Sequence, residues 1–228
     1  MESALPILKY PAVFLTSGLL CWVGLLILGR WAPRLKLLDV PRTRHPHARP
    51  VPLVGGLAIF GAFFGACLLI FWGPWGDFRG RLDGIWCGKF LIIAGVFTLL
   101  GVLDDRLEWK PRWKLAGQVL GAVAAYLLDV RFGRVLGLPV PVGLDLVATI
   151  VWFVAMVNAF NLIDGMDGVA TGMAITGGLG LLILFGLQRQ PGSVLVLLAM
   201  LGACSVFLRY NLHPARFFLG DAGSHLLG

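Results

Sequence analysis

Long apolar runs, separated by short polar loops, recur along the whole chain. Each run is close to the roughly 20 residues that a helix needs to cross a bilayer. The pattern predicts helices near residues 11–31, 53–72, 86–103, 114–130, 144–163, 169–187 and 193–209, and an eighth that begins near Phe217 and is cut off by the end of the chain. We therefore expect an all-α fold, a polytopic integral membrane helix bundle with seven complete transmembrane helices and the start of an eighth. No internal repeat or low-complexity linker is visible, so residues 1–228 are expected to form a single membrane domain.

The composition agrees with a protein that resides in lipid. Of the 228 residues, 58% are hydrophobic and 14% are charged, and the mean hydropathy is +0.85, whereas soluble domains carry about 25% charged residues. The first apolar run exceeds the core of a cleavable signal peptide and lacks a basic segment before it, so we expect a retained anchor. The four cysteines have no CxxC spacing and are expected to be small buried residues rather than a disulfide or metal set: Cys21, Cys67, Cys87 and Cys204.

A formal net charge of +7 is compatible with nucleic-acid binding, but the positions of the basic residues argue against it. One alternate set of loops carries twelve of the nineteen lysines and arginines: Arg30, Arg34, Lys36, Arg42, Arg44, Arg49, Arg106, Lys110, Arg112, Lys114, Arg209 and Arg216. In membrane proteins, loops rich in lysine and arginine face the cytoplasm. The sequence therefore predicts that these loops are cytoplasmic, that the N-terminus lies outside, and that no nucleic acid is bound.

Polar side chains recur at three-residue steps where the fifth apolar run ends. Asn158, Asn161, Asp164 and Asp167 follow one another in the segment Asn-Ala-Phe-Asn-Leu-Ile-Asp-Gly-Met-Asp-Gly, and residues three apart share one face of a helix. Amide and carboxylate oxygens suit a hard cation such as Mg²⁺, and ionisable groups at the edge of a hydrophobic span are usually functional. The alternative is a polar helix end that closes in an Asx turn.

A second acidic cluster, Asp104 and Asp105, follows the third apolar run. Adjacent carboxylates at a membrane edge repel one another unless a cation or a proton lies between them. The alternative is an ordinary acidic helix end balanced by Arg106. Lys114 and Gln118 lie one helical turn apart just beyond this pair, so both are able to face the same site.

A third cluster surrounds Asp221, which lies between two glycines in Phe-Leu-Gly-Asp-Ala-Gly-Ser. The glycines allow the backbone to approach a metal-bound phosphate closely. Phe218, three residues earlier, is suited to stack on a base or, equally, to pack in the core. Asn211 opens the segment Asn-Leu-His-Pro-Ala, in which Pro214 fixes a turn.

The first cytoplasmic loop concentrates Arg42, Arg44, His45, His47 and Arg49 between prolines, which keep the segment extended. Such a loop binds either a substrate phosphate or anionic lipid headgroups, and the charge pattern does not separate these two roles. The histidines do not indicate a metal site, because nothing nearby supplies the other ligands.

Taken together, these four segments resemble the polyprenyl-phosphate N-acetylhexosamine-1-phosphate transferases, a family of integral membrane enzymes. The Asp104-Asp105 pair is similar to the paired aspartates of the family, the segment from Asn158 to Gly168 to its central signature, and Phe218–Ser224 to its third motif. The resemblance covers almost the whole chain, in the family's order. It implies an Mg²⁺-dependent enzyme, with Mn²⁺ as a substitute, that moves a sugar-1-phosphate from a UDP-sugar to a membrane polyprenyl phosphate and releases UMP.

The resemblance also implies roles for single residues. Asn161 and Asp221 would bind the metal, while Asp104 and Asp105 would serve the lipid phosphate or the metal. Phe218 would stack on uracil, Lys114 would lie near the phosphates, and the nucleoside would lie near two further polar residues, Asp164 and Asn211. By position, Asp167 joins the catalytic set, and the remaining substrate-binding candidates are Asn158, Arg44 and His47. Pro50-Val-Pro-Leu-Val-Gly-Gly is closer to the GlcNAc-1-phosphate branch than to the phospho-N-acetylmuramoyl-pentapeptide translocase.

The same resemblance implies a multi-pass protein of the bacterial inner membrane with its active site on the cytoplasmic face, as a step in cell-wall or surface-polysaccharide synthesis. A homodimer is compatible with it, although no sequence feature requires one. Arg42 and His45 stand where the family commonly has Asn and Lys, and His225 stands where a small or apolar residue is usual. Family members continue beyond the position of Gly228, so the chain is expected to be incomplete at its C-terminus.

The competing hypothesis is a secondary transporter or lipid flippase, since intramembrane acidic residues also mark ion pathways. A transporter predicts acidic groups spread through the bilayer and inverted repeats. Here the acidic clusters all lie at one predicted edge and no repeat is visible. The sequence therefore favours the transferase.

Overall fold

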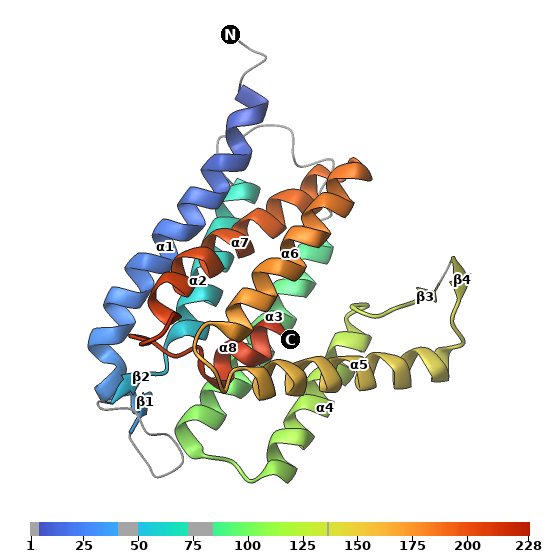
Figure 1. Cartoon of the computed structure of the whole chain (residues 1–228). Helices are drawn as coiled ribbons and strands as arrows, with labels where there is room; N and C mark the ends of the chain where they lie inside the picture. Colours follow the sequence, from blue (N-terminus) through green and yellow to red (C-terminus); the bar gives the residue numbers. More distant parts are fainter. Residues whose placement is uncertain (1–4, 41–49, 73–83, 136) are drawn as a thin grey trace.

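Helices make up most of the chain in the computed structural model, which describes residues 5–40, 50–72, 84–135 and 137–228 (Figure 1). Within these ranges the helices are α1 Leu5–Leu35, α2 Gly55–Trp72, α3 Gly84–Leu107, α4 Pro111–Leu127, α5 Val142–Ile163, α6 Val169–Leu187, α7 Pro191–Asn211 and α8 Gly220–Leu227. They follow the predicted order of seven helices and the start of an eighth. The prediction of an all-helical fold is confirmed.

The prediction of seven complete spans is not confirmed. In the described residues, five helical segments are long and apolar enough to cross a membrane: Leu8–Leu35, Cys87–Leu107, Val142–Ile163, Val169–Leu187 and Pro191–Asn211. The apolar part of α2, Gly55–Ile70, is shorter. The 17 residues of α4 reach about 26 Å, less than the roughly 30 Å of the hydrocarbon core, and Arg112 and Lys114 in its first turn reduce its apolar length further.

Small residues let α1, α2 and α7 pack closely in the main core. A Cβ at Gly202 of α7 would overlap the backbone of Phe14 in α1, and the buried hydroxyl of Ser17 donates a 2.6 Å hydrogen bond to the Ala199 carbonyl across the same interface. Cys21, Cys67, Cys87 and Cys204 are all buried and unbridged, as the sequence predicted. Helix α2 of this core also packs against α8.

Two short antiparallel strand pairs were not predicted. Strand β1 (Leu38–Asp39) pairs with β2 (Val51–Pro52), and β3 (Arg134–Val135) pairs with β4 (Leu138–Pro139). Each strand has only two residues, too few for an alternating pattern to be visible in the sequence. The first pair matters for function because it draws the two ends of the first predicted cytoplasmic loop together beside α8.

Helix α8 lies where the other elements converge. It packs against α2, α3 and α5, and α5 runs crosswise to α6 and α7 (Figure 1). The chain enters α8 beside the start of α2, since Gly55 N–H donates to the Phe218 carbonyl at 3.0 Å and Phe218 N–H donates to the Pro52 carbonyl at 2.9 Å. Segments far apart in the sequence are thereby brought to one place.

Candidate active site

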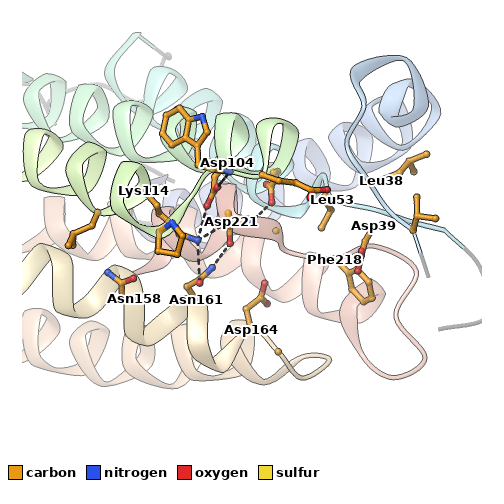
Figure 2. A pocket seen from close by; sticks show the side chains of 18 of the residues that line it. Leu38, Asp39, Leu53, Asp104, Lys114, Asn158, Asn161, Asp164, Phe218 and Asp221 are labelled. Carbon is orange, nitrogen blue, oxygen red and sulfur yellow. Dashed lines mark hydrogen bonds and ion pairs between the residues drawn. The ribbon is translucent and has the colours of Figure 1, made fainter. Parts of the chain in front are cut away.

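A cavity of about 780 Å³ opens where α3, α4, α5 and α8 meet (Figure 2). Most of the residues singled out from the sequence line it: Asp104, Asp105, Lys114, Asn158, Asn161, Asp164, Asp167, Phe218 and Asp221. They come from the ends of separate helices and from the segment before α8. The structure therefore brings the three acidic clusters together at one site.

The ammonium group of Lys114 lies at the centre of this site. It contacts Asp104 Oδ2 at 2.8 Å, Asp221 Oδ2 at 2.8 Å and Asn161 Oδ1 at 3.3 Å (Figure 2). Burial alone would lower the pKa of Lys114, but hydrogen bonds and charge from Asp104 and Asp221 outweigh it and raise the pKa above its usual value. Lys114 is therefore a permanent cation held by three oxygen atoms.

Asn161 and Asp221, the predicted metal ligands, are direct neighbours. The Asn161 amide nitrogen donates to Asp221 Oδ1, and at 3.2 Å to Ser224 Oγ. This contact joins the end of α5 to the first turn of α8. The two predicted ligands are thus held together by the fold.

Asp105 caps α8. Its two carboxylate oxygens accept the backbone N–H groups of Asp221 at 2.9 Å and Ala222 at 3.1 Å, as acidic residues do at helix N-termini. Gly220 has φ +72°, a conformation that favours glycine, and a Cβ there would lie 2.8 Å from Asp105 Oδ2. The paired aspartates therefore have different surroundings, because Asp104 accepts from Lys114 and, at 3.0 Å, from Trp109 N–H.

Negative charge dominates the cavity. Among the described residues that line it, Lys114 is the one cation. Seven lining side chains are acidic: Asp39, Asp104, Asp105, Glu108, Asp164, Asp167 and Asp221. Burial, and then the charges of Asp221, Asp105 and Asp167, raise the pKa of Asp164 to about 8. A site with this excess of carboxylates attracts a cation of higher charge than a lysine supplies.

The donor set fits Mg²⁺, which usually keeps several waters and takes only one or two protein carboxylates together with substrate phosphates. In the described residues, no three His, Cys, Asp or Glu side chains converge on one metal position. Asp221 and the amide oxygen of Asn161, already in contact with one cation, supply the oxygen chemistry that Mg²⁺ requires.

Asp167 and Asn211 hold the loops around the cavity. Asp167 accepts from Ala215 N–H at 3.2 Å and contacts His213 Nδ1 at 3.0 Å. Asn211 is 3% exposed, accepts from Gly168 N–H at 3.1 Å and donates to the Phe217 carbonyl at 3.1 Å. Asn211 does not line the cavity; its hydrogen bonds join the start of α6 to the segment before α8.

Two predicted substrate-binding residues, Arg44 and His47, lie outside the described residues. Conversely, Asp39, Glu108 and Trp109 line the cavity although the sequence gave no reason to select them. Asp39 directly precedes the basic loop and Glu108 follows the acidic pair by three residues. The sequence offered only one signal for these residues, namely that they lie close to the selected motifs.

Comparison with known proteins gives a consistent result. A model of glycosyl transferase family 4 matches residues 87–228. The chain is 31% identical over 241 residues to a decaprenyl-phosphate N-acetylglucosaminephosphotransferase of Mycobacterium tuberculosis, a match covering 99% of this chain and 59% of the relative. It is 32% identical over 229 residues to a probable undecaprenyl-phosphate N-acetylglucosaminyl 1-phosphate transferase of Bacillus subtilis, covering 97% and 61%.

A shorter match is a phospho-N-acetylmuramoyl-pentapeptide-transferase of Streptococcus pneumoniae, 37% identical over 153 residues, which covers 62% of this chain and 47% of the relative. The chain spans about three fifths of the length of the two N-acetylglucosamine relatives. These matches agree with the resemblance inferred from the motifs.

Proposed function

The chain belongs to glycosyl transferase family 4, and from this premise we propose that it transfers N-acetylglucosamine-1-phosphate from a UDP-sugar to a membrane polyprenyl phosphate, releasing UMP. The names of the M. tuberculosis and B. subtilis relatives support the sugar and the lipid acceptor. The observation that carries the proposal is the convergence of Asp104, Asp221 and Asn161 on the Lys114 ammonium group.

The chemistry requires neutralisation of charge more than covalent help. One phosphate oxygen attacks another phosphorus, and the reaction depends on in-line positioning and on stabilising the equatorial oxygens. A polyprenyl phosphate is largely dianionic near neutrality, because its second pKa is about 6. The acceptor therefore needs no strong general base from the protein.

Lys114 binds substrate phosphate in this proposal. Asp104 holds the ammonium group from one side, and the amide of Asn161 holds it from the other. Because Asp105 fixes the first turn of α8 through two backbone hydrogen bonds, the Asp221 carboxylate is held at a defined position. Mg²⁺, or Mn²⁺ in its place, bound by Asp221 and Asn161 would add charge neutralisation and orientation of the phosphates.

Choice of the donor sugar can be tested directly. Solubilised protein is offered UDP-GlcNAc or UDP-MurNAc-pentapeptide with undecaprenyl phosphate, and lipid products are separated chromatographically. We expect product only from UDP-GlcNAc. Transfer from the pentapeptide donor instead would reject the sugar assignment while leaving the reaction class intact.

Phe218 is proposed to stack on the uracil ring of the donor. Base–aromatic stacking contributes about 1–3 kcal/mol, so Phe218→Ala should weaken UDP-GlcNAc binding by roughly tenfold to a hundredfold. The apparent affinity for polyprenyl phosphate, which has no base, should not change. The backbone hydrogen bonds of Phe218 to Pro52 and Gly55 do not depend on the ring, so the local fold should survive.

Equilibrium dialysis of radiolabelled UDP-GlcNAc measures this effect. Phe132→Ala is the matched control, since Phe132 is a half-exposed aromatic residue that packs on Trp152 and does not line the cavity. Loss of thermal stability with unchanged UDP-GlcNAc binding would identify Phe218 as a packing residue and reject the uracil assignment.

The protein is a multi-pass membrane protein, and we propose that it lies in the bacterial inner membrane with the cavity at the cytoplasmic face. The excess of basic residues in the loops on that side supports this orientation. Single cysteines at Lys110 and Arg216 should then react with a membrane-impermeant maleimide only in inverted vesicles. Cysteines at Asp129 and Arg189 should react only in intact spheroplasts.

All four positions are exposed, and the four native cysteines are buried, so the background reaction should be low. Labelling of positions 110 and 216 from opposite sides would reject the topology and, with it, the shared cytoplasmic site.

A further inference from the structure

A chain of hydrogen bonds runs from the interior of the protein to the cavity wall. The Asn158 amide nitrogen donates at 2.6 Å to Gln118 Oε1, and Gln118 Nε2 lies 3.2 Å from His225 Nε2. Gln118 is 1% exposed and His225 is 3% exposed. Asn158 lines the cavity, whereas the other two residues do not.

The direction of this chain is set by a backbone carbonyl. The same Asn158 atom that meets Gln118 also lies 2.8 Å from the Val154 carbonyl oxygen, which only accepts hydrogen bonds. That atom must therefore be the Asn158 nitrogen, and the Gln118 atom facing it must be the oxygen. Gln118 then presents its nitrogen to His225, so His225 Nε2 must be the acceptor and the ring proton is carried by Nδ1.

Both hydrogens of the Asn158 amide are used within the protein, one by Gln118 and one by Val154. The Asn158 carbonyl oxygen is left for the cavity, and in Figure 2 it points toward the side where Asn161 lies. An oxygen presented in this way accepts a hydrogen bond from a hydroxyl or N–H group and repels a phosphate.

The histidine is a costly choice for packing alone. Its buried ring has two polar nitrogens, of which one faces Gln118 and the ring also interacts with the backbone of Phe97. An apolar side chain would fill a similar space without burying these polar atoms. A role in orienting Gln118 explains why a nitrogen acceptor is present there.

We propose that His225 is a positioning residue that, through Gln118, fixes Asn158 with its carbonyl oxygen toward the cavity, where it accepts a hydrogen bond from a hydroxyl or N–H group of the sugar-nucleotide donor. This inference rests on the proposed function, since that function supplies the donor. Without the acceptor at position 225, Gln118 is free to rotate its amide, and Asn158 then loses one of the two hydrogen bonds that fix its orientation, keeping only the one to Val154.

The test compares two substitutions in the membrane-embedded protein. His225→Leu removes the acceptor and should raise KM for UDP-GlcNAc about fivefold to tenfold, the effect of one neutral hydrogen bond, with kcat within about twofold of wild type. His225→Gln places an acceptor oxygen at a similar reach and should restore KM. The KM for polyprenyl phosphate should stay unchanged in both variants.

Two controls separate positioning from a general structural effect. Thr149→Val removes a buried polar atom that does not line the cavity and should leave KM unchanged. Asn158→Ala should raise KM like His225→Leu, and the double variant should show no further increase because both changes remove one hydrogen bond. Three results would each overturn the inference: a KM increase in the double variant equal to the product of the two single increases, an unchanged KM in His225→Leu, or a rise in the KM for polyprenyl phosphate.

Nitrogen-15 NMR of labelled histidines gives a reading that does not depend on activity. We expect Nε2 of His225 to be unprotonated and Nδ1 to be protonated, and protonated Nε2 would overturn the inference. If wild-type protein transferred no sugar phosphate, the proposed function would fail, whereas this NMR result would still decide the orientation of the amide chain.

Discussion

Asp221→Asn is expected to lower the rate of sugar-phosphate transfer at least about a hundredfold, because it removes the carboxylate that we propose as an Mg²⁺ ligand, and metal charge stabilisation supplies several kcal/mol. The substitution keeps the shape of the side chain. The backbone hydrogen bond from Asp221 N–H to Asp105 is independent of the side chain, so α8 should stay in place. Steady-state transfer assays over a range of Mg²⁺ concentrations measure the effect.

Asp129→Asn is the matched control for this substitution. Asp129 pairs with Arg131 on the surface and does not line the cavity, so its replacement should leave the transfer rate unchanged. Near-normal turnover of Asp221→Asn at saturating Mg²⁺ would show that Asp221 only stabilises the start of α8, and the metal assignment would have to be withdrawn.

Lys114→Met is expected to lower the transfer rate by about a hundredfold, comparable to the loss of one preorganised donor that stabilises transition-state charge. The substitution keeps the apolar stem and removes the cation that lies 2.8 Å from both Asp104 and Asp221. It also leaves these two carboxylates to repel an incoming phosphate. Lys114→Arg retains the charge and should lose much less activity.

Lys110→Met serves as the control, since Lys110 directly precedes the same helix but does not line the cavity. In wild-type protein, added salt should weaken donor binding by screening, and Lys114→Met should show a smaller dependence on salt. Equal losses in both lysine variants would mean that general surface charge, rather than Lys114 itself, attracts the phosphates.

The sequence was sufficient for the helical architecture because a membrane helix is long and uniformly apolar. It predicted seven complete spans, whereas five helical segments in the described residues are long and apolar enough to cross a membrane, and α4 carries basic residues in its first turn. The short β1–β2 pair had no visible pattern, although it helps bring the start of α2 beside Phe218. Such pairings depend on tertiary contacts rather than on local sequence.

The residues that line the cavity were also largely predictable from the sequence, since carboxylates at membrane edges are costly and therefore informative. The different contacts that each of these carboxylates makes were not predictable from the sequence. Asp104 and Asp105 are adjacent in sequence, yet one contacts Lys114 and the other caps α8. The hydrogen bonds of Asn211 depend on where Gly168 and Phe217 lie after folding, which spacing alone does not give.

The most direct test follows both products of the proposed reaction in one vessel. The intact protein is incubated with undecaprenyl phosphate, Mg²⁺ and UDP-GlcNAc that carries radiolabel in the sugar, and then butanol-extractable lipid and released nucleotide are quantified. The account predicts labelled lipid and an equal amount of UMP, with both abolished when EDTA removes the metal. Release of UDP instead of UMP, or no labelled lipid from well-folded protein, would contradict it.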